Sequence, residues 1–276
     1  MKIVTVATHE SGYFKILQEC CKKKNLELIV LGKDEYYYNH HFKDDKMIEF
    51  TNNCNKKEII LFLDGFDSIL SKNFDINEVE KKFIETKKNI IVSTEDSSKF
   101  FYLQKIIFNS AGFIPTENEF YLNTGMYIGY ADHINSFLKY SKNFITDENC
   151  KSNQRLWQDV LKVNKELLFL DTESIFFRNL SNNKEIEKMM KNIYKEPFVL
   201  SCPTADIGLH FDKYLTYIGY KMVQKKKIMN LKFFFRKIFF YNKRINIVKF
   251  PLTAFSKFTK KFPLTAFRLI KQNLII

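Results

Sequence analysis

Apolar and polar positions along the first hundred residues follow the pattern of strands separated by amphipathic helices. Short apolar runs predict strands at 2–8, 26–32, 58–64 and 89–95. Between them, apolar side chains recur at the three- and four-residue spacing of one helix face in residues 12–25, 46–55 and 77–88. This β-α-β order predicts an α/β fold with an open, mostly parallel sheet and helices on both faces.

Polar side chains follow three of the predicted strands at the points where those strands end. The clusters are Thr8-His9-Glu10, Asp64-Gly65-Phe66-Asp67 and Ser93-Thr94-Glu95-Asp96. Ligands of open α/β sheets bind outside the carboxyl ends of the strands. We therefore expect the three clusters to gather along one edge of the sheet.

The middle cluster places two carboxylates directly after a strand that is apolar from Ile59 to Leu63. One interpretation is an ordinary Asp/Gly turn, because both residue types favour turns. The other is a metal site, since hard carboxylate oxygens suit Mg²⁺ or Mn²⁺ bound together with a substrate phosphate. Apolar character returns at Ser68-Ile69-Leu70, so the pair is flanked by core on both sides, which favours the site.

The net charge of +13 is concentrated at one end of the chain. Residues 221–276 hold 15 Lys and Arg without an Asp or Glu, which leaves 29 basic and 31 acidic residues in 1–220. A nucleic-acid-binding body would carry its own basic face, so we expect no nucleic-acid partner. We predict two parts, a catalytic-type domain at 1–220 and a basic, aromatic-rich tail at 221–276.

Cysteine usage and hydropathy bear on where the protein works. The five cysteines are scattered and form no Cys-x-x-Cys pair, which supports neither a zinc ribbon nor a disulfide framework. No apolar run reaches 18 residues, and the N-terminal segment lacks a signal-peptide pattern. We therefore expect a cytoplasmic protein in a reducing environment.

Five segments together resemble a known family. "TVATHESGYFKIL", "LGKDEYYY", "LFLDGFDSIL", "YLNTGMYIGYA" and "LDTESIFFRNL" occur in the order seen in the glycosyltransferase domain of procollagen lysyl hydroxylases and its microbial and viral relatives. The resemblance covers about residues 2–180, and the "LDGFD" and "LNTGMYIGYA" blocks are its most specific parts. It implies a GT-A fold, a UDP-sugar donor and a Mn²⁺ or Mg²⁺ ion.

On the donor side, the resemblance assigns roles to residues of the first two strand-end clusters. Asp64 and Asp67 would be metal ligands, and Val6, Ala7 and Thr8 would line a uridine pocket. Tyr37 would lie against the uracil, with the choice among Tyr36, Tyr37 and Tyr38 open by one position. An aromatic face suits a base because stacking provides affinity at little entropic cost. A packed loop is the alternative for each tyrosine.

On the sugar side, the resemblance places Glu95 and Asn123 near the transferred sugar. Glu95 and Asp96 also suit a helix N-cap, a role that Asp96 fits better. Gly125 and Gly129 interrupt an apolar strand pattern. Glycine at such positions indicates either a close approach of a ligand or backbone, or a bulge.

Two departures from the family pattern concern the remaining site residues. Asn153-Gln154 stands where the family has Asp-Gln, and an amide can bind a sugar hydroxyl but cannot act as a base. The family also has a late metal-binding His among glycines. His210, the histidine that follows His133, is the candidate third ligand, although its surroundings lack those glycines. A solvated or diphosphate-contacting His210 is the competing interpretation.

The tail carries ten Phe among its 15 cations and repeats FPLTAF at Phe250 and Phe262. Three interpretations are open: a packed helical appendage, a membrane-surface anchor, and a nucleic-acid-binding segment. The anchor is favoured, because Phe enters the interface while Lys and Arg meet anionic headgroups.

Together with these patterns, the resemblance implies a metal-dependent glycosyltransferase that would move a hexose from a UDP-sugar to a hydroxyl acceptor. The acceptor would be a glycan, a lipid-linked sugar or a protein at the cytoplasmic membrane face. The altered Asp-Gln pair keeps an alternative open, a catalytically silent protein that binds sugar nucleotides or associates with the membrane.

We expect the tail to bind anionic membrane, because each Lys or Arg near such a surface contributes about 1 kcal/mol within a Debye length. A chain ending at Tyr220 should no longer sediment with anionic liposomes but should still bind UDP and Mn²⁺. Added salt should weaken full-length binding only in part, since the Phe rings contribute an apolar component. If the full-length protein ignores anionic liposomes at low salt, the anchor hypothesis is wrong.

Overall fold

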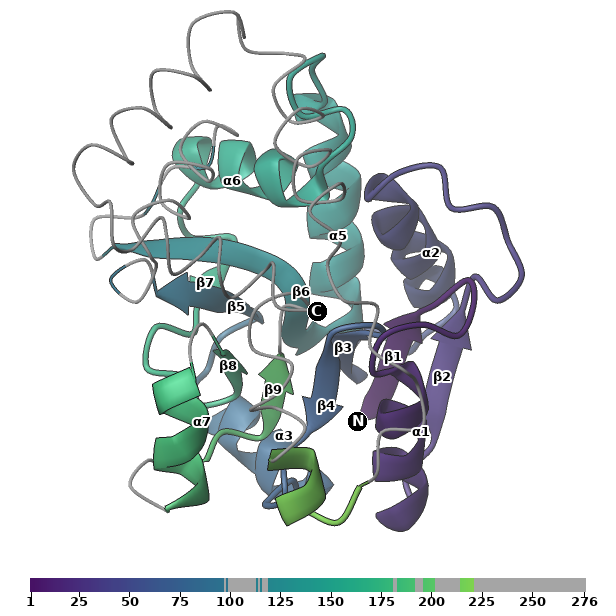
Figure 1. Ribbon diagram of the computed structural model, residues 1–276. Coiled ribbons are helices and arrows are strands. Elements are labelled where there is room, and N and C mark those ends of the chain that lie inside the picture. The colour runs from purple at the N-terminus through teal and green to yellow at the C-terminus, as the bar shows by residue number, and fades with distance from the viewer. Residues whose placement is uncertain are drawn as a thin grey trace, which may run out of the picture. The chain divides into compact units, whose positions relative to one another are not determined.

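The described residues form two sheets flanked by helices (Figure 1). The computed structural model describes residues 1–96, 98, 113, 115, 119–180, 183–191, 196–201 and 214–220, all of them within one compact unit. The strands are β1 (Lys2–Val6), β2 (Leu28–Leu31), β3 (Ile59–Asp64), β4 (Ser68–Leu70), β5 (Ile90–Asp96), β6 (Phe120–Tyr130), β7 (Phe169–Leu170), β8 (Phe177–Asn179) and β9 (Val199–Ser201). The helices are α1 (Phe14–Lys23), α2 (His41–Asn52), α3 (Ile76–Glu85), α5 (Ala131–Ser141), the 3-10 turn η2 (Lys142–Phe144), α6 (Asn153–Val163) and α7 (Asn183–Met190).

The larger sheet confirms the predicted α/β class. Its strand order is β2-β1-β3-β6-β5-β7. β1 pairs in parallel with β2 and β3, and β5 pairs in parallel with β7, whereas β6 is antiparallel to both β3 and β5. All the other strands of this sheet therefore share one direction, and the carboxyl ends of β1, β3 and β5 meet at one edge together with the first half of β6.

Alternation along the central strands divides the apolar core between the two faces of this sheet. Ile59, Leu61 and Leu63 pack with α1, α3 and the smaller sheet β4-β9-β8. Ile60 and Phe62 point the other way and pack with α2, α5 and α6. In Figure 1, helices α2, α5 and α6 lie on one side of the larger sheet, and α3 and the smaller sheet lie on the other. Both faces of β3 are therefore buried, as its unbroken apolar run predicts.

Helix α2 begins at His41, five residues before the predicted start at Lys46. Its buried side chains include the polar residues His41, Asp44 and Thr51 beside Phe42 and Met47. A helix that buries polar groups shows no clean apolar stripe, so the periodicity could not locate its first turn. That first turn proves to carry residues of the site.

The carboxyl end of β5 is held by the segment that follows β7. The buried carboxylate of Asp171 accepts three backbone N–H bonds, from Ile175 at 2.9 Å and from Phe176 and Phe177 at 2.8 Å. Its own carbonyl accepts the hydroxyl of Thr94 at 3.0 Å. Asp171 thereby orders its own loop and fixes the residue that precedes Glu95.

Two sequence predictions concern residues beyond the described part of the chain. The tail at 221–276 and His210 both lie outside the described residues. None of the helices that the structure describes has the length and hydropathy needed to cross a bilayer.

Candidate functional site

Asp64 is the last residue of β3 and lies beside the predicted uridine-lining segment. Val6, at the end of β1, is the registered partner of Asp64. Ala7 and Thr8 follow directly and are buried, with the Ala7 N–H bonded to the Leu31 carbonyl at 3.1 Å. The sheet thus brings the first two strand-end clusters together, as the sequence predicts.

The turn after Asp64 is tightly packed against the segment that follows β1. One oxygen of Asp64 accepts the N–H of Phe66 at 3.1 Å. A Cβ on Gly65 would lie 2.8 Å from the Thr5 hydroxyl, and one on Gly12, at φ +54°, would lie 2.2 Å from the Phe66 carbonyl oxygen. Side chains are therefore excluded at both glycines, and the carboxylates are held on a rigid turn.

Lys43 of α2 places its ammonium against the other oxygen of Asp64. Both side chains are only 13% exposed. Burial alone would lower the pKa of Lys43, but the charge of Asp64, with smaller contributions from Tyr37 and Asp67, raises it above the ordinary lysine value. The sequence prediction missed Lys43, because it lies in the polar first turn of α2, where no motif marks it.

The donor set suits a hard divalent cation. Asp64 already meets one cation, the Lys43 ammonium, and Asp67 acts on the same ammonium through its charge. Within the described part of the chain, no three His, Cys, Asp or Glu side chains converge as a complete metal shell would require. The two aspartates would supply only part of such a shell, so their role as metal ligands stays a prediction, and the predicted third ligand, His210, lies outside the described residues.

The three consecutive tyrosines differ in their surroundings. Tyr36 is 83% exposed, and Tyr38, 48% exposed, donates its hydroxyl to Asp45. Tyr37 is half-buried with its ring 5.5 Å from that of Phe42, and burial raises the pKa of its phenol. The charges of Lys43 and Asp64 also act on that pKa, so Tyr37 lies near the ion pair. The assignment of Tyr37 to the uracil stays a prediction.

Glu95 and Asn123, which the sequence analysis expects near the sugar, are hydrogen-bonded to each other. The Asn123 amide donates to a Glu95 carboxylate oxygen, and its own oxygen accepts the Gly125 N–H at 2.7 Å. Burial raises the pKa of Glu95 to about 7, although the bond from Asn123 lowers it. A Cβ on Gly125 would lie 3.7 Å from the Asp64 Cβ, so this glycine brings the Glu95–Asn123 pair close to Asp64. Between the pairs Val92–Tyr127 and Thr94–Leu122, β5 advances two residues and β6 advances five, so the register irregularity places extra residues in β6 within 123–126, around Gly125.

Asn153 and Gln154 begin α6, and each has a partner inside the fold. Asn153, 5% exposed, donates to Asp44 at 2.9 Å and accepts the Thr124 hydroxyl at 3.2 Å. Gln154 donates to the Leu122 carbonyl at 2.7 Å. A contact of Asn153 with an acceptor stays a prediction, and it would require breaking one of two buried hydrogen bonds.

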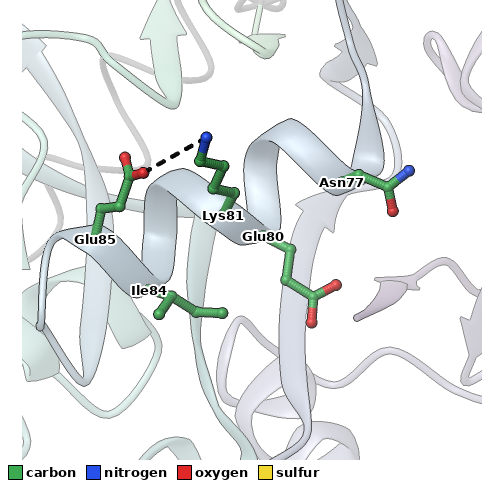
Figure 2. Close-up of a pocket in the computed structure, with 5 residues that line it drawn as sticks. All are labelled: Asn77, Glu80, Lys81, Ile84 and Glu85. Atoms are coloured by element: carbon green, nitrogen blue, oxygen red, sulfur yellow. Dashed lines mark ion pairs between the residues drawn. The ribbon is translucent and has the colours of Figure 1, made fainter.

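A separate hollow of about 350 Å³ lies along α3 and contains none of the predicted site residues (Figure 2). Its lining residues, all from this one helix, are Asn77, Glu80, Lys81, Ile84 and Glu85. A hollow lined by a single helix offers a ligand no opposing wall, and we assign it no role.

One family model matches most of the chain, and several solved structures align with it at low sequence identity. The family model described as the PLOD GT domain matches residues 1–200 of the 276. Among solved structures, a glycosyltransferase involved in the glycosylation of the major capsid of PBCV-1 aligns with a TM-score of 0.48 and 11% identity, over 78% of this chain and 99% of that one. Galactosyltransferase LgtC aligns with a TM-score of 0.45 and 11% identity, over 82% and 98%. Mouse xyloside xylosyltransferase 1 aligns at 0.38 and 12%, over 72% and 84%. No curated protein gives a significant match.

We expect Glu95→Gln to remove a pH dependence of stability. The pKa of Glu95 is about 7 in the folded protein and near the ordinary value of about 4.3 in the unfolded chain. The folded state therefore binds this proton more tightly. The resulting stabilisation is complete below about pH 4 and is lost as the pH rises through 7.

The unfolding free energy of the wild type, relative to the variant, should fall by about 1–3 kcal/mol across that window. Urea unfolding at a series of pH values measures the difference. The control is Glu85→Gln on the exposed surface of α3, which should track the wild type throughout. Parallel curves for wild type and Glu95→Gln would contradict the raised pKa.

Proposed function

The chain belongs to the PLOD glycosyltransferase-domain family, and on that basis we propose that it transfers a hexose from a UDP-sugar to a hydroxyl acceptor with the aid of Mn²⁺ or Mg²⁺. The observation that carries the proposal is the Asp64 carboxylate, fixed at the end of β3 beside the segment Val6–Thr8 and already in contact with a cation. Carboxylates alone would repel a diphosphate, so a site of this kind needs positive charge between the two.

On the donor side, each residue has a physical task. Asp64 and Asp67 would hold the ion, and the bound ion would neutralise the charge that develops on the departing UDP. Tyr37 would stack against the uracil, and the backbone of Val6–Thr8 would border the nucleoside. Lys43, held at Asp64, keeps that carboxylate oriented and supplies a positive charge at the phosphate side.

On the acceptor side, the Glu95–Asn123 pair lies close to Asp64 across Gly125. A carboxyl group with a pKa of about 7 is present in both protonation states near neutral pH. Such a group can accept a proton or a hydrogen bond from a reacting hydroxyl at working pH. The Asn123 amide binds one oxygen of the Glu95 carboxylate, and this bond sets the orientation of the other oxygen.

Our proposal for the acceptor class and the site of action rests on the sequence of 221–276. Its 15 cations and ten Phe suit a peripheral contact with an anionic membrane. We place the enzyme in the cytoplasm at that surface, acting on a glycan, a lipid-linked sugar or a protein hydroxyl.

The competing function is a silent sugar-nucleotide-binding protein. It is favoured by Asn153, which replaces a family acid and whose amide is engaged within the fold. A mass-spectrometric screen of UDP-hexoses with Mn²⁺ separates the two, because only an enzyme hydrolyses a donor in the absence of its acceptor. No turnover of any UDP-hexose, together with retained UDP binding, would favour the silent protein.

We expect Asp64→Ala and Asp67→Ala each to abolish Mn²⁺-dependent UDP binding while the protein stays folded, because either change removes a hard oxygen ligand. Isothermal titration calorimetry with UDP and Mn²⁺ measures the loss, and circular dichroism checks the fold. Asp75→Ala, which removes the N-cap of α3, is the control and should leave the affinity unchanged. Unchanged affinity in both site variants would refute the metal assignment.

We expect Tyr37→Ala to weaken UDP binding by about 1–3 kcal/mol through the loss of base stacking. The same calorimetric titration tests Tyr36→Ala and Tyr38→Ala as neighbours. A loss in one of them instead would move the stacking position by one residue. If all three variants bind UDP as the wild type does, the uracil pocket lies elsewhere.

A further inference from the structure

The carboxylate of Asp44 is buried at the contact between α2 and α6. The residue is 4% exposed. One oxygen accepts the Asn153 amide at 2.9 Å, and the other accepts the indole N–H of Trp157 at 3.1 Å. Burial raises the pKa of Asp44 to about 6, while these two bonds lower it. A buried charge of this kind is expensive, and apolar residues of similar volume often serve stability as well or better.

The contacts of Asp44 continue toward both halves of the proposed site. Asn153 accepts the Thr124 hydroxyl at 3.2 Å, and Thr124 lies in β6 directly between Asn123 and Gly125. On the other side, Lys43 precedes Asp44 in α2 and contacts Asp64. Two consecutive residues of α2 thus bind the end of β3 and the start of α6.

We propose that Asp44 is a positioning residue, which through Lys43 and Asn153 fixes Asp64 and Asn123 relative to each other. We call the hydrogen-bonded group of Asp44, Asn153, Trp157 and Thr124 the clamp. The inference rests on the proposed function, because it concerns the alignment of the donor and sugar sides of one site. It also accounts for Asn153: an acid there would face the Asp44 carboxylate at hydrogen-bonding distance, whereas the amide donates to it.

The clamp predicts that the acid and the amide can be exchanged. In the double variant Asp44→Asn/Asn153→Asp, the new amide at position 44 accepts from Trp157 and donates to the new carboxylate at position 153. That carboxylate accepts the Thr124 hydroxyl, so all three hydrogen bonds are kept. Asn153→Asp alone places a second buried carboxylate against that of Asp44, and each disfavours the charged form of the other. Asp44→Asn alone keeps the shape but removes the charge.

The four proteins are compared in full length by calorimetry with UDP and Mn²⁺. We expect Asn153→Asp to weaken UDP binding about tenfold and the double variant to recover to within about twofold of wild type. Thermal unfolding is measured in parallel. Asn149→Asp is the matched control, because Asn149 is also buried and donates to Asp159 at 3.0 Å outside the clamp. It should lower the melting temperature without changing UDP affinity.

Trp157 provides a second readout, because it is the single tryptophan of the chain. Its emission should shift when UDP and Mn²⁺ bind to the wild type, and the shift should be lost in Asn153→Asp and return in the double variant. Binding that is equal in all four proteins, or that fails to recover in the double variant, would overturn the clamp while leaving the proposed function intact. If calorimetry detects no UDP binding by the wild type, the proposed function itself is wrong and the inference falls with it.

Discussion

The ion pair between Lys43 and Asp64 is the interaction on which the rest of the site depends. Strand β3 is buried on both faces, and its last residue, Asp64, carries a carboxylate that is largely removed from water. An unpaired charge in that position would be costly, and the ammonium from α2 offsets it. The Lys43–Asp64 pair holds the first turn of α2 against the end of β3. The next residue of that turn, Asp44, then contacts α6. The position of one charge thus connects the sheet to two helices on the same face.

The architecture followed from the sequence because its signals are local. Apolar runs and helical spacing marked β1, β3, β5, α1 and α3, and the strand-end rule brought Val6, Asp64 and Glu95 to one edge. The reversed direction of β6 could not be predicted, since a strand's own pattern does not state which way its neighbours run.

The supporting side chains were not predictable for a different reason. Lys43 and Asp44 belong to a polar stretch, "HFKDDK", that is typical of a solvated surface. Their burial follows from partners 21 and 109 positions away, and no spacing rule joins such residues. Likewise, Asn153 stands where the family has an acid, which in the sequence suggested the loss of a catalytic group. In the structure, its amide donates a hydrogen bond to Asp44. Local sequence patterns therefore do not predict buried polar contacts between residues far apart in the chain.

Strand β6 runs against the other described strands of the larger sheet, and its middle residues limit how this domain can change. Gly125 beside Asp64, Thr124 beside Asn153 and Asn123 beside Glu95 are consecutive residues that use opposite faces of one strand. This segment already holds more residues than the part of β5 that it faces, so its exact length determines which neighbour each of the three residues meets. A change in the length of this segment would therefore displace all three contacts at once, whereas a substitution acts first at the position replaced.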